Sequence, residues 1–589
     1  MEGPRSGTAS AVWSDSGTPQ SATGREADGN AQNIFMKIPV ICTTLLIEKS
    51  PQALPLGAAC IASAIKNNSE TKDLCSVSLK VFSLEDKDIQ NILRSHSGEN
   101  TNQYIAKYVS DEILKLTNGR KAIICISTFV WNVDILKKAA VILKKNNCIC
   151  IAGGPEITAH PSFYKEFNFT VSGEGETSVP KIISKILKSE KVDNVIISES
   201  PDLSLLNSPY LDGIINPSDY EGALWELARG CPFKCSYCYE SKGEKTVRLF
   251  PMERIKTELE LFSRKKIPQI FVLDPTYNVN KKRAVEILRL IREKTPDTFY
   301  YFEARAEFID RELAREFTKI PCSLQIGLQS ANESVLKTLN RPWDKKKFLK
   351  GISVLNEEGV TFGLDLIFGL PGETFSSFRN GMDFAFSLYP NNLEVFCLSV
   401  LPGTDLYDRA DELGLKYQKT PPYHVIQNKE LQAGEMERLE KLSKACSIFY
   451  NEGRAVPWFN SICKCLRLNG TKLLEIFYER KLALNKDYEN CCEHKLIEKL
   501  QLDFLKDLFI EKNMQRLFKV AEDIIKFYGA ISRTTATGKS EIVELNHNAE
   551  YVASEYASDI RWFSGNIKPK KSKIQTFMNQ GQADFKFIK

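Results

Sequence analysis

Short apolar runs alternate with amphipathic helical segments along two long stretches of the chain, residues 38–187 and residues 221–417. Apolar runs of this length between helices are typical of strands buried on both faces, and strands joined through helices run parallel. The sequence therefore predicts two α/β units in succession. A chain of 589 residues is long enough for three or four domains.

The first stretch favours a doubly wound parallel sheet. The expected strands are Ile38–Ile47, Val77–Phe82, Ala122–Ser127, Cys148–Ile151 and a strand that ends at Val171-Ser172. We therefore predict a Rossmann-like domain over residues 36–190. Residues 1–35 are expected to be a disordered leader, because Ser, Gly, Thr and Ala dominate there without periodicity. Residues 191–220 carry many Ser, Pro, Asn and Asp residues, which indicates a linker.

The second stretch contains six strand candidates separated by helical segments. They are Leu224–Ala228, Gln269–Leu273, Phe299–Glu303, Ser323–Gly327, Phe362–Phe368 and Glu394–Val400. Six such units predict a partial (β/α)6 barrel over residues 221–425, with its working face at the C-terminal ends of the strands. Residues 426–589 are rich in Lys, Leu and Glu at helical spacing, so we expect a mostly α-helical C-terminal domain.

Composition excludes several functional classes. The formal net charge of +5 is spread over 79 basic and 74 acidic side chains, which does not favour a nucleic-acid partner. No run of eighteen apolar residues predicts a membrane span, and no apolar segment typical of a secretory signal follows the start. Sixteen cysteines form no regular framework, and several lie in apolar runs, which favours a reducing, cytoplasmic location.

Three cysteines, Cys231, Cys235 and Cys238, directly follow the first barrel strand. Three thiolates within eight residues can hold one [4Fe-4S] cluster, each binding one iron, and the missing fourth cysteine leaves one iron open for chemistry. The alternative is a zinc knuckle or a chance grouping. Zinc needs a fourth Cys or His nearby, and no histidine falls between Cys238 and Gly327.

This Cys-x3-Cys-x2-Cys loop on the first strand of a partial barrel resembles the radical S-adenosylmethionine (SAM) superfamily. The segments Gln325–Ser330 and Asp365–Glu373, with Arg341 between them, resemble its fourth and fifth strands. The resemblance implies that SAM binds the open iron and is cleaved by one electron to a 5′-deoxyadenosyl radical. It also implies that SAM contacts Tyr237, Glu303, Arg305, Gln325, Ile367 and Gly369.

Other interpretations of these residues remain open. Glu303 and Arg305 could form an ion pair that fills the barrel, and Gly369–Gly372 could be a tight turn without a ligand. The chain also departs from the family pattern after the second strand, where Asp274-Pro275-Thr276 replaces the usual Gly-Gly-Glu. The contact to the amino group of SAM is therefore unassigned.

Glycine and hydroxyl residues gather at the expected strand ends of the first domain. They are Leu56, Gly57, Ser127, Thr128, Gly153, Gly154, Pro155, Gly173, Glu174, Gly175 and Glu176. Glycine lets a backbone approach a large ligand, although it is also common at the turns of any doubly wound fold. In this order before such a barrel, the residues resemble the cobalamin-binding domain of the cobalamin-dependent branch. The Asp-x-His-x-x-Gly signature is absent, so the lower ligand of cobalt is unassigned.

Taken together, the resemblance implies a cobalamin-dependent radical SAM enzyme that transfers a methyl group to an unactivated carbon of a small molecule. An electron donor such as flavodoxin or ferredoxin is the expected protein partner. The alternatives are a radical cyclisation or oxidation without methyl transfer, and a non-catalytic cluster-bearing sensor. A second metal site is conceivable, but the spacing favours structural roles for the residues concerned, which are Cys463, Cys465, Cys491, Cys492 and His494.

Overall fold

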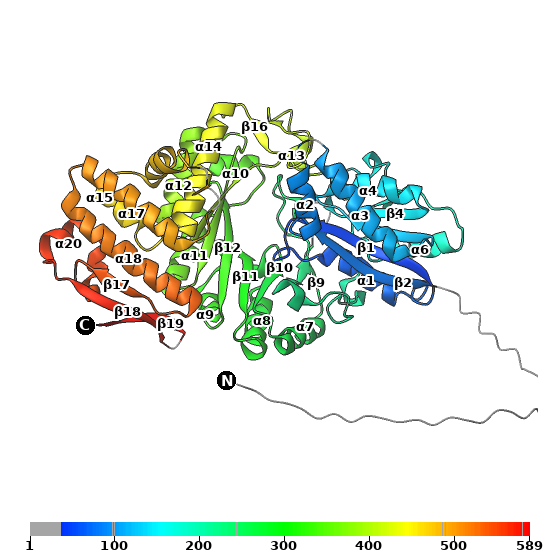
Figure 1. Ribbon diagram of the computed structural model, residues 1–589, viewed down its shortest axis with the longest axis horizontal. Helices are drawn as coiled ribbons and strands as arrows, with labels where there is room; N and C mark the ends of the chain where they lie inside the picture. The colour runs from blue at the N-terminus through cyan, green and yellow to red at the C-terminus, as the bar shows by residue number, and fades with distance from the viewer. Residues whose placement is uncertain are drawn as a thin grey trace, which may run out of the picture.

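The protein is described by a computed structural model that covers residues 37–588, except residues 97, 99, 242–245, 486, 489–490 and 580. The leader expected over residues 1–35 lies outside the described residues. Three regions follow one another in space as they do along the chain (Figure 1). An N-terminal α/β domain and a C-terminal helical region lie on opposite sides of a central open barrel, and this is the fold class that the sequence predicts.

The N-terminal domain contains one parallel sheet in the order β2-β1-β3-β4-β5-β6. Its strands are β1 (Ile38–Leu46), β2 (Cys75–Ser83), β3 (Ala122–Ser127), β4 (Cys148–Gly153), β5 (Phe169–Ser172) and β6 (Val195–Ile197). Helices α1 (Leu56–Asn67) and α6 (Ser178–Leu187) cover one face. The opposite face is covered by α2 (Lys87–Ser95), α3 (Thr101–Thr117), α4 (Val133–Lys145) and α5 (Pro155–Ala159). The strand order reverses between β1 and β3, which is where such sheets bind ligands.

Strand β6 lies in the segment that the composition predicts to be a linker. It pairs in parallel with β5, for example Thr170 with Val195. The strand has three residues at the edge of the sheet, and the side chains of Val195 and Ile197 are exposed. Its three residues are apolar, but a run this short within a segment rich in polar and turn-forming residues is not enough to predict a strand.

The central sheet contains six parallel strands that pair in chain order, so its two edge strands remain apart and the barrel is open. The strands are β7 (Ala223–Glu226), β10 (Gln269–Leu273), β11 (Phe299–Ala304), β12 (Cys322–Gln329), β13 (Phe362–Phe368) and β14 (Asn392–Cys397). The outer face packs against α7 (Met252–Lys265), α8 (Lys281–Lys294), α9 (Arg311–Phe317), α10 (Glu333–Thr338), α11 (Lys345–Glu358) and α12 (Phe375–Ser387). Side chains alternate along each strand, so polar residues such as Asp365 face the barrel interior.

The C-terminal region begins by covering the edge strand β14. Helix α14 (Ala433–Cys446) continues into a π-helical turn, Ser447–Glu452, and Asn451 in that turn bonds both backbone groups of Leu393. These bonds satisfy an edge that would otherwise be open to another strand. The short elements before α14 are α13 (Asp405–Asp408), β15 (Lys416–Tyr417) and β16 (Val425–Gln427).

The rest of this region is helical except at its end. The helices are α15 (Phe459–Leu466), α16 (Gly470–Phe477), α17 (His494–Glu511), α18 (Gln515–Thr537), α19 (Ala549–Val552) and α20 (Ile560–Asn566). An antiparallel sheet that the helical spacing did not predict follows α18; it consists of β17 (Ile542–Leu545), β18 (Ser572–Asn579) and β19 (Gln582–Phe587). In the described part of the chain, no helix is long and apolar enough to cross a membrane.

Candidate functional site

The three cysteines predicted to bind a cluster lie in one loop, residues 230–240, at the C-terminal end of β7. A short antiparallel pair, β8 (Ala228–Arg229) and β9 (Arg248–Leu249), holds the base of this cysteine loop. Cys235 is buried, whereas Cys231 and Cys238 are half-buried. Burial raises the pKa of Cys231 and raises that of Cys238 to about 11, and the neighbouring Cys235 adds to both shifts. These thiols therefore need a cation nearby to become thiolates at neutral pH.

The spacing of the thiols fits a cluster better than a single ion. Among the residues that the structure describes, no three His, Cys, Asp or Glu side chains converge as one metal ion requires. An iron–sulfur cube does not require such convergence, because each thiolate binds a different iron. Zinc does require it, with four ligands around one ion. The loop therefore fits a cluster, and the zinc interpretation gains no support.

The C-terminal cysteines likewise belong to no group of three metal-binding side chains among the described residues. Cys463 and Cys465 are buried on the packed face of α15. The ring of His494 contacts the backbone oxygen of Gly453 and the guanidinium of Arg533. These contacts support the structural interpretation of this group.

Arg341 places a positive charge beside the cysteine loop. Its Nη1 lies 3.7 Å from Cys235 Sγ and 3.3 Å from the hydroxyl oxygen of Tyr237, a predicted SAM contact. Its other terminal nitrogen donates to the carbonyl of Gly327 at the end of β12. A Cβ at Gly327 would lie 2.2 Å from Gln329 Nε2 and 3.2 Å from Arg341 Nη2, so the glycine leaves room for both side chains.

A cavity of about 590 Å³ separates the cysteine loop from the N-terminal domain. We call it the interdomain chamber. It is lined by Gly154, Pro155, Gly173 and Glu174 from the first domain, and by Arg229, Gly230, Tyr239, Glu240, Asp274 and Glu303 from the barrel. Burial raises the pKa of Glu303, and repulsion from Glu240 and Asp274 adds to the shift. Glu303 therefore faces the interdomain chamber, where SAM, its predicted ligand, would lie.

Arg305 does not share that space. Its guanidinium donates to Glu307 over 2.7 Å and to the carbonyl of Pro342. It also lies 4.1 Å from the ring centre of Phe233, in the cysteine loop. Arg305 therefore supports the loop from outside the chamber, and the ion pair it forms is with Glu307 and not with Glu303.

The remaining predicted SAM residues lie further inside or beside the barrel. Gln325 Nε2 donates to Asp365, whose pKa is raised to about 7 by burial. Ile367 alternates onto the same interior face as Asp365. Gly369 has a φ of +88°, and a Cβ there would lie 2.9 Å from Cε of Met436 in α14. The turn and the close approach of α14 therefore account for this glycine without a ligand.

Most residues predicted to contact cobalamin surround one cavity of about 200 Å³ at the C-terminal edge of the first sheet. Eight of the eleven line this strand-end cavity: Gly57, Ser127, Gly153, Gly154, Gly173, Glu174, Gly175 and Glu176. The other three do not line it. Leu56 packs against the barrel core, Thr128 Oγ1 bonds the carbonyl of Gly153 over 2.9 Å, and Pro155 lines the interdomain chamber.

Two adjacent glycines line this cavity, but the backbone requires glycine at only one of the two positions. Gly154 has a φ of +106°, and a Cβ there would lie 2.4 Å from the carbonyl oxygen of Thr128. The fold itself therefore requires glycine at this position. At Gly153 the nearest atom to an added Cβ is Val171 O at 3.7 Å, which is an ordinary contact. The fold therefore does not require glycine at position 153, and the missing side chain leaves room for a ligand there.

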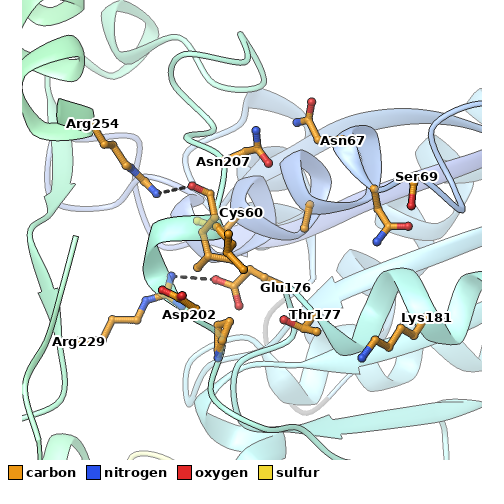
Figure 2. Close-up of a pocket in the computed structure, with 15 residues that line it drawn as sticks. Cys60, Asn67, Ser69, Glu176, Thr177, Lys181, Asp202, Asn207, Arg229 and Arg254 are labelled. Carbon is orange, nitrogen blue, oxygen red and sulfur yellow. Dashed lines mark hydrogen bonds and ion pairs between the residues drawn. The ribbon is translucent and has the colours of Figure 1, made fainter. Parts of the chain in front are cut away.

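Arg229 connects the cysteine loop to the strand-end cavity. Its guanidinium donates to Glu176 over 2.8 Å and to Glu226 over 2.7 Å, and it also pairs with Glu174. Figure 2 shows the Arg229–Glu176 contact at the edge of a third cavity, of about 410 Å³, between α1, α6 and the segment after β6. Arg229 lines all three cavities. No sequence motif assigned a role to Arg229, and its place two residues before Cys231 is the signal that could have found it.

Two family patterns match the chain. The radical SAM superfamily matches residues 225–385, and a protein family of unknown function, DUF4080, matches residues 411–527. Similar proteins include the cobalamin-dependent radical SAM methyltransferase TokK of Streptomyces tokunonensis, 26% identical over 50% of this chain and 49% of that protein. Another is an uncharacterised methyltransferase of Pyrococcus horikoshii, 23% identical over 67% of this chain and 87% of that protein.

A solved structure shares the fold across nearly the whole chain. The cobalamin-dependent SAM radical enzyme OxsB superposes with a TM-score of 0.51 and 13% identity, covering 91% of this chain and 85% of OxsB. The chain spans about half the length of TokK and 44% of a carbapenam methyltransferase of Streptantibioticus cattleyicolor, to which it is 26% identical.

The cysteine loop at the first strand of an open six-stranded barrel lies within this match: residues 225–385 form a domain that matches the radical SAM superfamily. Within it, the chain is similar to the cobalamin-dependent radical SAM methyltransferases.

Proposed function

We propose that this protein is a cobalamin-dependent radical SAM methyltransferase acting on a small molecule. The observation that carries the proposal is the interdomain chamber, which brings the cysteine loop opposite the strand ends of the Rossmann-like domain. When bound, a [4Fe-4S] cluster supplies an electron for reductive cleavage of SAM, and cobalamin supplies a carrier for a methyl group. A chamber of about 590 Å³ between the two cofactor positions leaves room for a substrate.

Each residue group then has a role. Cys231, Cys235 and Cys238 would hold the cluster, and the guanidinium of Arg341 lies 3.7 Å from Cys235 Sγ. Glu303 accepts hydrogen bonds from SAM within the chamber, and Tyr237 lies beside the adenine. The strand-end cavity holds part of cobalamin against Gly57, Gly153 and Gly173.

Anaerobic reconstitution followed by mass spectrometry of the SAM products tests this function. We expect S-adenosylhomocysteine together with 5′-deoxyadenosine, and loss of both in the triple variant with alanine at Cys231, Cys235 and Cys238. A matched control is the Cys463→Ala/Cys465→Ala protein, which should keep its iron. Formation of 5′-deoxyadenosine alone would instead indicate a radical reaction without methyl transfer. A triple variant that keeps its iron and its activity would refute the proposal.

A further inference from the structure

A groove of about 460 Å³ lies on the outer side of the cysteine loop, away from the interdomain chamber. Residues 232–234 form one wall, and residues 333–343, which include helix α10, form the other. Phe233 and Trp343 contribute half-buried aromatic surface, and Trp343 Nε1 is buried without a hydrogen-bond partner among the described residues. Neither the proposed SAM contacts nor the proposed cobalamin contacts account for this outer groove.

The groove and the cysteine loop share their walls. Asn340 Nδ2 donates to the carbonyl of Lys234 over 2.8 Å, and the amide of Ser236 donates to the carbonyl of Leu339 over 2.9 Å. Cys235 lies buried between these two segments, within 3.7 Å of Arg341 Nη1. The outer groove is therefore the exposed surface that lies directly over a proposed cluster ligand.

The rim of the groove is basic. The side chains of Lys234 and Lys337 line it and are exposed, and neither forms an ion pair with another described residue. Lys345 lies beside it, with Nζ 5.9 Å from the ring centre of Trp343. Glu333 is the acidic side chain in the lining. Aromatic surface within a mostly basic rim is typical of a transient contact between proteins, where complementary charge steers the encounter.

We propose that the outer groove is the docking surface for an acidic protein that carries one electron at a time. This inference rests on the proposed function. The reduced carrier loses one electron, which passes through the cysteine loop. One SAM accepts that electron as its sulfonium–C5′ bond breaks, giving methionine and a 5′-deoxyadenosyl radical that takes hydrogen from substrate. The basic rim recognises the acidic surface of the carrier, and the aromatic floor lies between the carrier and Cys235.

Charge reversal with two different reductants tests the docking surface. The Lys337→Glu/Lys345→Glu protein, in which both changes lie outside the cysteine loop, is compared with wild type, with reduced flavodoxin or with dithionite as the electron source, by the rate of 5′-deoxyadenosine formation. With flavodoxin at low salt we expect a fall of about tenfold or more, because complementary charge governs the association rate. With dithionite, a small reductant that needs no docking surface, the rate should be unchanged. The wild-type rate with flavodoxin should also fall as salt rises.

Two further variants make the outcome decisive. Lys337→Glu alone also leaves the cysteine loop untouched and should show the same selective loss to a smaller extent. Lys568→Glu/Lys570→Glu makes an equal charge change on exposed residues of the C-terminal region and should behave as wild type with both reductants. Equal rates with flavodoxin in all variants, or a parallel fall with dithionite, would overturn the docking surface. Absence of dithionite-dependent cleavage in the wild type would instead refute the proposed function, and this inference with it.

Discussion

Arg229 Nη2 donates a hydrogen bond of 2.8 Å to Glu176, and this contact joins the base of the cysteine loop to the strand-end cavity of the N-terminal domain. The side chains are largely buried, with 14% of Arg229 and 8% of Glu176 exposed. Glu174 and Glu226 bind the same guanidinium. One arginine therefore links the two proposed cofactor positions.

Replacement of Arg229 by methionine should destabilise the protein. Three carboxylates would be left together, with Arg248 remaining as a partner for Glu174. Breaking a buried ion pair from one side typically costs about 3–5 kcal/mol, since the remaining charges stay desolvated. Urea unfolding curves measure the loss. Lys107→Met is the control, because its exposed pair with Asp111 should be worth about 0.5 kcal/mol or less. Equal stability of the two variants would contradict the role of Arg229.

The adjacent glycines of the strand-end cavity should respond differently to substitution. Gly153→Val places methyl groups in a cavity of about 200 Å³, so we expect the fold to persist and binding of added hydroxocobalamin to fall. Gly154→Ala places its Cβ 2.4 Å from Thr128 O at a positive φ, so we expect a lower thermal midpoint instead. Visible absorbance of bound cobalamin and thermal melting separate these effects. Undiminished cobalamin binding by folded Gly153→Val would exclude this cavity as the site.

Arg341 and Arg305 should differ when each is changed to lysine. Arg341→Lys keeps the charge but loses the planar guanidinium that contacts Cys235 and Tyr237. The rate of SAM cleavage should therefore fall roughly tenfold to a hundredfold, which corresponds to the loss of one charged hydrogen bond. Arg305→Lys loses its stacking on Phe233 outside the chamber, so the thermal midpoint should fall while SAM affinity is kept. Equilibrium SAM binding and the cleavage rate are measured on both. Loss of SAM affinity in Arg305→Lys would restore the direct contact that the sequence suggested.

Asp365 should make stability depend on pH. Burial raises its pKa to about 7 against the hydrogen bond from Gln325, with repulsion from Glu394 adding to the rise. Since the unfolded pKa is about 4, the folded state binds this proton more tightly, and the resulting stability is present below pH 4 and lost as pH rises to 7.

Asp365→Asn carries no charge at any pH in this range. Its stability relative to wild type should therefore increase between pH 4 and pH 7 by up to about 4 kcal/mol, and then stay constant. Urea unfolding of both proteins at several pH values gives the difference. Burial also raises the pKa of Glu373 to about 7. Glu373 is present in both proteins, so its contribution does not enter the difference in stability. A difference that does not change with pH would show that Asp365 is ionised throughout.

The sequence by itself determined the parts that depend on local spacing. Gln269–Leu273 and Phe362–Phe368 are strands with the predicted bounds, because apolar runs between helices admit few other structures. The three cysteines form one loop because they fall within eight consecutive residues. The strand-end glycines line one cavity because the ends of parallel strands meet at one edge of the sheet.

Contacts between distant segments were decided only by the tertiary structure. Arg305 lies two residues from Glu303, and strand alternation suggested that both point inward, but β11 ends at Ala304 and the chain turns Arg305 toward Phe233. Arg229 meets Glu174 and Glu176 across more than fifty residues of sequence, and no local pattern encodes that pairing. Local spacing fixes secondary structure, whereas the partner of a charged side chain depends on which surfaces the packed domains bring together.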